Sequence, residues 1–258
     1  MLLSIITVCL NEVTTIENTL KSVAGQSFQG FEWTIIDGGS SDGTLEIINN
    51  YRTRINYLIS EKDSGTYNAM NKGIRLSKVE YLLFLNGGDQ LISSDILEKV
   101  FSSRQYHQIL YGNLAYSKNN KIENIFIPES PISRKSLYHR TLPHPATFIR
   151  RELFLKYGLY DESYKIAADY NFFLKVVLKK KVKPQYLPVT VSVFDSEGIS
   201  TLNEKLRLSE KKRAMLLYYN FFDRLKYDFA IHERIHYLFN FIRYPRFLGG
   251  YLKKKIFH

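Results

Sequence analysis

Apolar, strand-like runs alternate with helically spaced segments through the first hundred residues, and this alternation constrains the fold more than any other feature. Residues 3–10 form a continuous, partly β-branched run, as expected for a strand buried on both faces. Ile16, Leu20 and Val23 then recur at helical spacing after Asn11, which is expected to cap that helix. The alternation continues with strands at 32–37, 55–60 and 81–86, and with helices at 42–51, 66–76 and 94–101. This order predicts right-handed βαβ units and a mostly parallel central sheet flanked by helices.

The pattern changes in the second part of the chain. Residues 109–127 read as strand, turn and strand, with the turn at 118–120. A short strand at 144–149, a helical turn at 152–157, a helix at 168–179 and a strand at 186–194 follow, and the chain is expected to be helical after residue 200. The sequence therefore predicts one α/β domain over residues 1–200 and a helical C-terminal extension over 201–258.

The extension carries most of the chain's positive charge. From Lys205 onward there are thirteen Lys and Arg residues against four Asp and Glu, a local balance of 13 − 4 = +9 within a formal total of +11. Aromatic side chains are interleaved with these cations, at Phe221, Phe222, Tyr227, Phe229, Tyr237, Phe239, Phe241, Tyr244 and Phe247. This composition suits an anionic membrane surface, nucleic acid or an acidic partner, while a solvated or packed helix face remains the plain alternative.

Cysteine usage and hydropathy indicate the compartment. Cys9 is the sole cysteine, so an intramolecular disulfide is impossible and a reducing cytosol is expected. The apolar first ten residues lack the basic segment of a signal peptide, and no run approaches the ~18 apolar residues of a spanning helix. We expect a cytoplasmic protein, peripheral at the inner face of the plasma membrane.

Polar residues gather where the predicted parallel strands end. The first strand ends at Asn11 and Glu12, the second at Asp37, the third near Asp63 and the fourth at Asp89. In open α/β sheets ligands bind beyond these carboxyl ends, so the convergence of several such loops predicts a binding crevice. The alternatives are local: Asp42 is favoured as a cap of the second helix, Asp63 is balanced between cap and ligand, and Asp37 is favoured as a ligand.

The segment Asn86-Gly87-Gly88-Asp89 is the most informative of these loops. A buried strand delivers a carboxylate on a Gly-Gly hinge, where backbone can approach a ligand closely. Mg²⁺ and Mn²⁺ need only one or two protein carboxylates when diphosphate oxygens and water complete the shell. Asp89 is therefore the candidate metal ligand.

Together, several segments resemble family 2 glycosyltransferases with the GT-A fold, in a branch that assembles bacterial polysaccharides. The matching segments are SIITV at 4–8, NE at 11–12, IDGGSSDGT at 36–44, SEKDSGTYNAMNKGI at 60–74, FLNGGD at 84–89, PHPATF at 143–148 and AADYNF at 167–172. The resemblance spans residues 3 to 200 and implies a donor half over 1–104 and an acceptor half over 105–200. It implies an inverting, metal-dependent hexosyl- or N-acetylhexosaminyltransferase that uses a nucleotide-sugar, with UDP favoured.

The resemblance also assigns roles to single residues. Asp37 and Asp63 would bind the uracil and ribose side of the donor. Asp89 would hold Mn²⁺ or Mg²⁺, and Asp169 would be the general base. The donor-binding set is Thr7, Leu10, Asn11, Glu12, Asp37, Gly39, Asp63, Asn71, Asn86 and Gly88, and the acceptor-side set is His144, Ala168 and Asp169. The acceptor would be a glycan, on a polyprenyl lipid that brings it to the membrane.

Three positions depart from the family pattern. Gly87 stands where the family keeps the first acid of its Asp-x-Asp motif, Ala168 replaces an acid before the base, and Met70 replaces an arginine. For Asp169 a helix N-cap competes with catalysis, and for His144 a structural role competes with lining the acceptor pocket. Residues 196–201 resemble a loop that closes over the diphosphate, or form a plain turn. His232 and His236, one turn apart, are read as part of an amphipathic surface.

Two other functions compete with this interpretation. A sugar-phosphate nucleotidyltransferase would need a Gly-rich, basic loop after the first strand, and residues 10–13 contain neither glycine nor base. A basic nucleic-acid-binding protein would explain the tail but not the acidic crevice, whose carboxylates repel phosphate without a metal, so nucleic acid is not the expected partner. The sequence does not indicate an oligomeric state.

Overall fold

The computed structural model describes residues 1–102, 107–118, 121–195 and 203–228. The chain divides into two compact units, Met1–Met215 and a second unit that begins at Leu216. The first unit holds the sheet and its helices, and it runs past the boundary predicted at residue 200. The second unit contributes one described helix.

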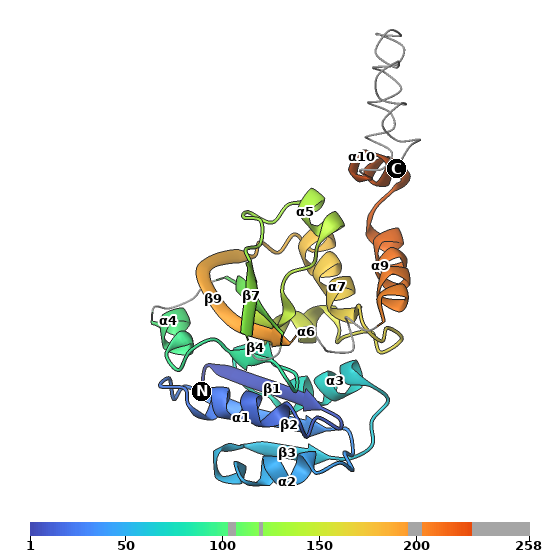
Figure 1. Cartoon of the computed structure of the whole chain (residues 1–258). Helices are drawn as coiled ribbons and strands as arrows, with labels where there is room; N and C mark the ends of the chain where they lie inside the picture. The colour runs from blue at the N-terminus through green and yellow to red at the C-terminus, as the bar shows by residue number, and fades with distance from the viewer. Residues whose placement is uncertain (103–106, 119–120, 196–202, 229–258) are drawn as a thin grey trace, which may run out of the picture. The chain divides into compact units, whose positions relative to one another are not determined.

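A single nine-stranded sheet organises the described part of the first unit. The strands are β1 Leu3–Cys9, β2 Phe31–Asp37, β3 Tyr57–Ser60, β4 Tyr81–Phe84, β5 Gln90–Leu91, β6 Ile109–Lys118, β7 Lys121–Phe126, β8 Thr147–Arg150 and β9 Gln185–Asp195. Their order is β3-β2-β1-β4-β8-β6-β9-β5, and β7 pairs with β6 outside this path. Figure 1 shows the first of these strands stacked in that order from β3 upward.

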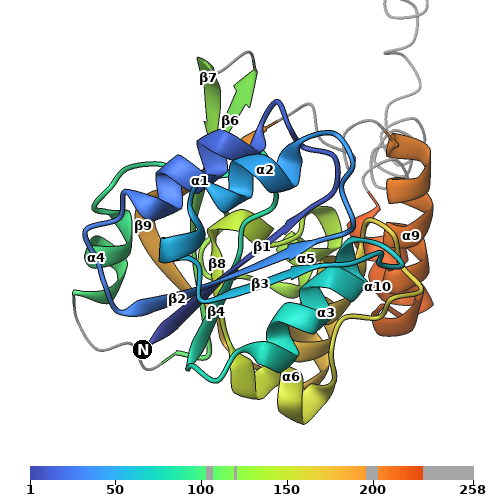
Figure 2. The same cartoon turned by 90° about the horizontal axis from the view of Figure 1, so that it is seen from below.

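The helices connect and cover these strands. They are α1 Ile16–Ala24, α2 Thr44–Asn49, α3 Thr66–Leu76, α4 Ile96–Phe101, α5 Arg134–His139, α6 Arg151–Tyr157, α7 Ala168–Phe173, α9 Glu204–Tyr218 and α10 Phe221–Tyr227, with the short helical segments η1 Arg52–Arg54, η2 His144–Ala146 and η3 Leu174–Lys179. Seen from below, α1 and α2 lie on one side of β1, β2 and β3, and α3 lies on the other (Figure 2). Helices on both faces explain why β1 and β2 are buried along almost their whole length.

The strands β1, β2, β3 and β4 are parallel, as the alternation predicts. All seven residues of β1 are buried, in line with a strand covered on both faces. Helix α3 packs so closely on β1 that a Cβ at Gly73 would lie 2.5 Å from a methyl carbon of Ile6. Register brings Cys9 beside Asp37 and Asp37 beside Ser60, so these strands end together at one edge.

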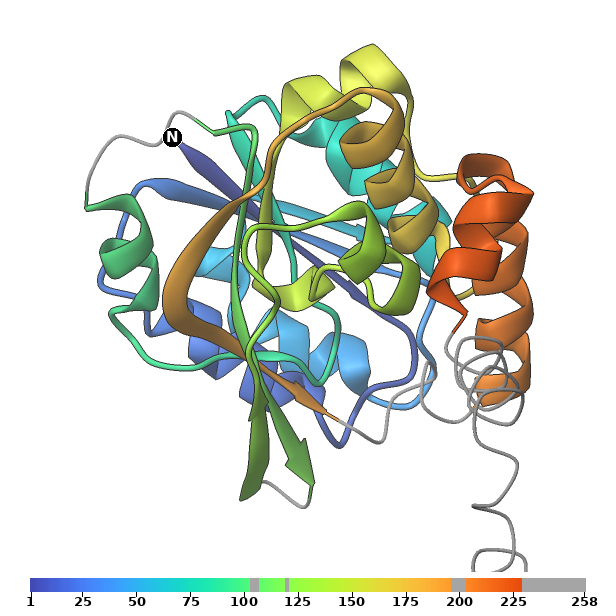
Figure 3. The same cartoon turned by 90° about the horizontal axis from the view of Figure 1, so that it is seen from above.

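The second half of the sheet is mixed. Strand β8 runs antiparallel to both β4 and β6, and β6 pairs in parallel with β9. Figure 3 shows β9, in orange-brown, bending strongly as it runs beside β6, where the register shifts twice. The predicted α/β GT-A architecture is confirmed, and the change of rhythm after residue 104 corresponds to this antiparallel insertion.

Several local predictions were wrong. Helix α1 begins at Ile16, and Asn11 does not cap it: Asn11 has a φ of 54° and its Oδ1 accepts a hydrogen bond from the Ser41 N–H at 3.0 Å. The N-cap of α2 is Gly43 rather than Asp42. The segment expected as a strand at 144–149 begins with the helical turn η2, because the Thr147 Oγ1 and the Ala146 N–H both bond to the carbonyl of Pro143.

A buried carboxylate of α9, most of which lies in the first unit, holds the loop that precedes α7. Glu210 accepts hydrogen bonds from the backbone N–H groups of Lys165, Ile166 and Ala167, at 2.7, 2.8 and 3.0 Å. These residues form the loop that leads into α7. The glutamate is 7% exposed, so it is a buried anion neutralised by three backbone dipoles.

The second unit is described through α10. Asn220 and Asp223 form a reciprocal capping box at its start, and Phe221 and Phe222 are exposed. Within the described ranges, no helix is both long and apolar enough to cross a membrane. Residues 196–201, His232, His236 and the aromatic residues from Phe229 onward lie outside the described residues.

Candidate active site

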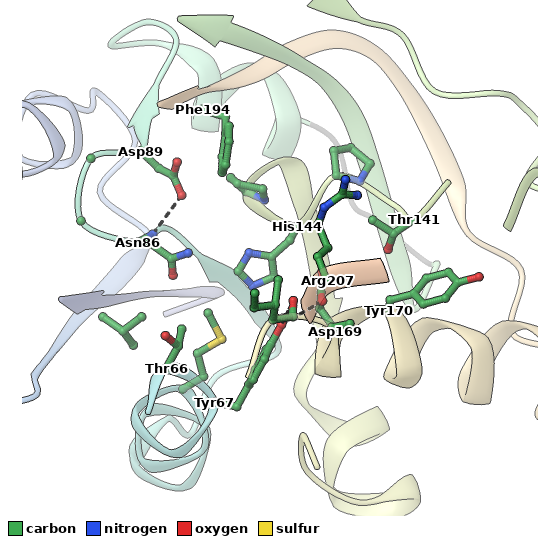
Figure 4. Close-up of a pocket in the computed structure, with 18 of the residues that line it drawn as sticks. Thr66, Tyr67, Asn86, Asp89, Thr141, His144, Asp169, Tyr170, Phe194 and Arg207 are labelled. Atoms are coloured by element: carbon green, nitrogen blue, oxygen red, sulfur yellow. Dashed lines mark hydrogen bonds between the residues drawn. The ribbon is translucent and has the colours of Figure 1, made fainter. Parts of the chain in front are cut away.

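A cleft of about 1060 Å³ opens at the carboxyl ends of the parallel strands in the first unit. One wall comes from the ends of β1 and β4 and the start of α3. The other comes from the segment between α5 and β8, the start of α7 and the first turns of α9. The two halves implied by the family resemblance therefore meet across one cavity (Figure 4).

Most of the predicted site residues line this cleft. On the donor side these are Leu10, Glu12, Asp63, Asn86, Gly88 and Asp89, and on the acceptor side His144 and Asp169. The convergence expected from the strand ends is thus present in the structure. Their roles in binding and catalysis stay predictions.

The loop after β4 places Asp89 at the edge of the cleft. The Gly88 N–H donates to Thr19 Oγ1 at 2.9 Å, and Gly88 has a φ of 96°, which favours glycine. The turn is closed by the Asn86 N–H, which donates to Asp89 Oδ2 at 3.3 Å. Asp89 is only 3% exposed. The carboxylate is therefore held in a defined position rather than extended into solvent.

This loop lies directly against Glu12. A Cβ at Gly87 would lie 2.9 Å from Glu12 Cγ and 3.2 Å from Cys9 Cβ, so the acid that the family has here would collide with its neighbours in this arrangement. The absence of a side chain at Gly87 brings the β4 loop and the Glu12 side chain together. Thr15 donates to Glu12 Oε2 at 2.7 Å and orients that carboxylate.

The donor wall has ligands suited to a hard cation. Among the described residues, no three His, Cys, Asp or Glu side chains are arranged so that they alone could hold a metal ion. The Asn86 Oδ1 is buried without a hydrogen-bond partner within the described part of the chain, and the backbone N–H of the same residue bonds to the Asp89 carboxylate. A carboxylate and an unpartnered amide oxygen from one short loop are the oxygen ligands that Mg²⁺ and Mn²⁺ bind, with phosphate and water completing the shell.

Asp169 lies on the acceptor wall in the first turn of α7. It is not the N-cap, which is Ala167, so the capping alternative was wrong. The Tyr67 hydroxyl, from α3, lies 3.0 Å from Asp169 Oδ1 and 2.7 Å from the carbonyl of Ile166. Burial and the negative charge of Asp169 raise the pKa of Tyr67 well above its usual value, so the phenol stays a proton donor.

His144 lies between the two walls in Figure 4. Its ring stacks on Phe84, with centroids 5.4 Å apart and planes at 21°. Burial lowers the pKa of His144, against the charge of Asp169, which acts in the opposite direction. The imidazole is therefore neutral at pH 7, and its Nε2 has no hydrogen-bond partner among the described residues. A neutral ring with an open nitrogen can accept or donate one hydrogen bond to a ligand.

Asp37, predicted as a nucleotide ligand, is fully buried and does not line the cleft. Its oxygens accept hydrogen bonds from Ser40, from Gly39 and from Ser60 Oγ at 2.6 Å. In this structure the carboxylate organises its own loop. The loop touches the donor wall, because a Cβ at Gly38 would lie 2.9 Å from Asp63 Oδ2.

Other predicted residues also lie behind the cleft wall. Thr7 Oγ1 accepts from the Trp33 Nε1 at 3.1 Å, and Gly39, with a φ of 85°, turns the loop after β2. Asn71 is 1% exposed and bonds both backbone groups of Tyr160. Ala168 is buried at the start of α7, and its neighbour Ala167 lines the cleft. These residues support the wall from behind.

Several residues that line the cleft were not predicted from the sequence. Tyr67 stood inside a quoted motif but gave no signal for its contact with Asp169, which lies 102 positions away. Arg140, Thr141, Arg207 and Lys211 also line the cleft. The basic residues of α9 were interpreted as a solvent or membrane face, because nothing in the local sequence indicates that this helix packs beside α7.

The chain is similar to known proteins over most of its length. Residues 4–157 match the family model described as Glycosyl transferase family 2. A PGL/p-HBAD biosynthesis glycosyltransferase of Mycobacterium tuberculosis is 31% identical over 202 residues, which cover 76% of this chain and 77% of that protein. The match extends from the donor half into the acceptor half.

Solved structures share the fold. Residues 1–349 of Staphylococcus aureus TarS, in complex with UDP-GlcNAc, give a TM-score of 0.65 at 21% identity, over 78% of this chain and 61% of that one. The mannosyltransferase PcManGT of Pyrobaculum calidifontis, with GDP-Man and Mn²⁺, gives 0.62 at 16% identity, over 81% and 61%. In a further TarS structure this chain spans only 43% of the solved chain. At these identities the likeness describes the fold alone.

Proposed function

The chain belongs to glycosyltransferase family 2, and from this premise we propose that it transfers a sugar with inversion from a nucleotide-diphosphate donor to a hydroxyl of a glycan acceptor. The observation that carries the proposal is the pairing of two carboxylates across one cleft. Asp89 lies on the donor wall and Asp169 on the acceptor wall. The relatives solved with UDP-GlcNAc and with GDP-Man support a nucleotide-sugar donor, and we favour UDP.

The donor would lie along the ends of β1 and β4. Leu10, Glu12 and Asp63 border the space for the nucleoside, and Asn86, Gly88 and Asp89 border the space for the diphosphate. Asp37 and Gly39 would act through the loop that supports Asp63. A bound Mn²⁺ or Mg²⁺, held by Asp89 with Asn86 Oδ1 in reach, would neutralise negative charge on the diphosphate.

Asp169 would accept the proton of the attacking acceptor hydroxyl. Tyr67 orients this carboxylate, and the loop before it is held by Glu210. A base on the wall opposite the leaving group activates a nucleophile that attacks the anomeric carbon from the far face, which inverts the configuration. His144, neutral and with Nε2 open, would bind a hydroxyl of either sugar.

The first test is calorimetric titration with UDP, GDP and dTDP, with and without Mn²⁺. We expect Mn²⁺-dependent binding of one nucleotide, UDP, that is lost in Asp89→Ala. Asp95→Ala is the matched control, because Asp95 is exposed, pairs with Lys99 and lies outside the cleft. Binding that is equal with and without Mn²⁺, or unchanged in Asp89→Ala, would contradict the assignment of the metal site. No binding of any nucleotide would contradict the donor class.

A further inference from the structure

Three cations from two separate segments meet on the acceptor wall of the cleft. Arg140 follows α5, and Arg207 and Lys211 lie one turn apart on α9. The Lys211 ammonium donates to the carbonyl of His139 at 2.6 Å and lies 5.3 Å from the centre of the Tyr170 ring. Its position is therefore fixed by both segments.

The three charges act on one another. Burial, together with the positive charges of Arg207 and Arg140, lowers the pKa of Lys211. Burial raises the pKa of Tyr116, and the charges of the same two arginines act in the opposite direction, so both arginines also face that side of the cleft. Among the described residues, one ion pair involves the cluster: the exposed Glu204 carboxylate lies 3.4 Å from the Arg207 guanidinium. The wall thus carries an excess of positive charge.

An unpartnered hydroxyl adjoins these cations. Thr141 Oγ1 is buried and has no hydrogen-bond partner within the described part of the chain. Thr141 directly follows Arg140 in the chain, and Figure 4 shows Thr141 and Arg207 on one side of the cleft, Asn86 and Asp89 on the other, and His144 and Phe194 between them. Cations around an open hydroxyl donor are the groups that bind phosphate oxygens.

The position of the cation cluster in the cleft indicates which substrate phosphate it would bind. The donor diphosphate belongs with Asp89, whereas Arg207 and Thr141 lie on the opposite side of the cleft in Figure 4, and Lys211 lies against the Tyr170 ring. We propose that Arg140, Arg207, Lys211 and Thr141 form a phosphate subsite for the acceptor, which therefore carries a phosphate or diphosphate ester close to its reactive hydroxyl. The inference rests on the proposed function, because it takes the other wall as the donor site.

Direct binding tests the subsite without sugar transfer. Farnesyl diphosphate, farnesol and inorganic pyrophosphate are titrated into the full chain with UDP and Mn²⁺ already saturating. We expect farnesyl diphosphate and pyrophosphate to bind, and farnesol not to. Arg207→Gln and Lys211→Gln should each weaken diphosphate binding about tenfold or more, as expected for a lost charge-assisted hydrogen bond. Tighter binding of farnesyl diphosphate than of pyrophosphate would indicate a lipid-linked source, and equal binding a soluble one.

Controls separate the subsite from folding and from the donor site. Lys212→Gln removes a charge from an exposed position of the same helix and should change nothing. Arg207→Lys should retain more binding than Arg207→Gln. The affinity for UDP and the melting temperature should stay unchanged in Arg207→Gln. The proposal would be overturned if diphosphate binding survived both Arg207→Gln and Lys211→Gln, or if the diphosphate competed with UDP. A wild-type protein that does not bind UDP would instead count against the donor site.

Discussion

Asp169 shows how much of the candidate chemistry depends on one side chain and its neighbours. It lies in the first turn of a helix from the second half, and Tyr67 from the first half contacts it at 3.0 Å. The sequence motif places an acid at this position but is silent about the tyrosine. The contact connects α3 to the proposed base on α7. Local sequence patterns cannot indicate such a contact, because its two residues lie far apart in the chain.

Asp169→Asn removes the proton acceptor and keeps the shape of the side chain. We expect kcat to fall by about 10²–10⁴-fold, the usual contribution of a positioned base. The dissociation constant of UDP should stay unchanged, because the residue lies on the acceptor wall. Transfer assays with calorimetry of UDP binding check this, and wild-type kcat in the variant would exclude Asp169 as the base.

Tyr67→Phe removes only the hydroxyl. We expect a loss of about tenfold in kcat with unchanged UDP binding, since a hydrogen bond to a charged group is worth about 1.5–3 kcal/mol. Tyr160→Phe is the matched control: Tyr160 packs against Tyr67, and its hydroxyl has no partner among the described residues. Equal losses in the two variants would indicate a packing effect instead.

We expect His144 to make the free energy of unfolding depend on pH in the acid range. Because burial lowers its pKa, the unfolded chain binds a proton below about pH 6.5 that the native protein does not take up. Stability from this residue is therefore present above the unfolded pKa and lost as pH falls below it. In His144→Gln, the free energy of unfolding should decline less between about pH 7 and 5 than in the wild type. Equal slopes would contradict this assignment.

At the scale of single elements, most strands and helices of both halves followed from their patterns, whereas helix α5 and the mixed pairing of β4, β6, β8 and β9 were not predicted. Strands β1, β2 and β4 are apolar because helices cover both faces, and the pattern reports this directly. Helix α1 began later than expected because Asn11 bonds to Ser41 across the cleft edge, a contact between loops. The bend of β9 and the packing of α9 likewise depend on partners distant in sequence.

A substitution at Glu210 tests whether α9 holds the loop that precedes α7. Glu210→Ala leaves three backbone N–H groups without their acceptor, so we expect a loss on the order of 3 kcal/mol in unfolding free energy. The loop before α7 should shift and lower kcat as well. Lys212→Ala, at an exposed position of the same helix outside the cleft, is the control. Unchanged stability and kcat in Glu210→Ala would mean that α9 does not hold this loop.

At the scale of the molecule, the chain after Met215, here called the tail, belongs to a compact unit of its own. It can therefore be removed while the first unit is kept. We propose that the tail binds an anionic membrane: residues 229–258 contain six Lys and Arg against one Glu, with aromatic residues between them, and each cation adds about 1 kcal/mol near an anionic surface. A chain ending at Phe222 should keep UDP binding and no longer co-sediment with anionic liposomes. Co-sedimentation of the shortened chain would refute the anchor.

Helix α9 lies outside the segment that matches the family model, yet its Glu210 holds the loop of the base and its Arg207 and Lys211 line the cleft. If Asp169 and the phosphate subsite act as proposed, this short stretch of chain couples catalytic alignment to the choice of acceptor, while the nucleotide half is left untouched. Selection can then diversify acceptors within this lineage by altering a single exchangeable segment. For the same reason, grafting the equivalent helix from a relative is a practical route to redirecting the enzyme toward another glycan.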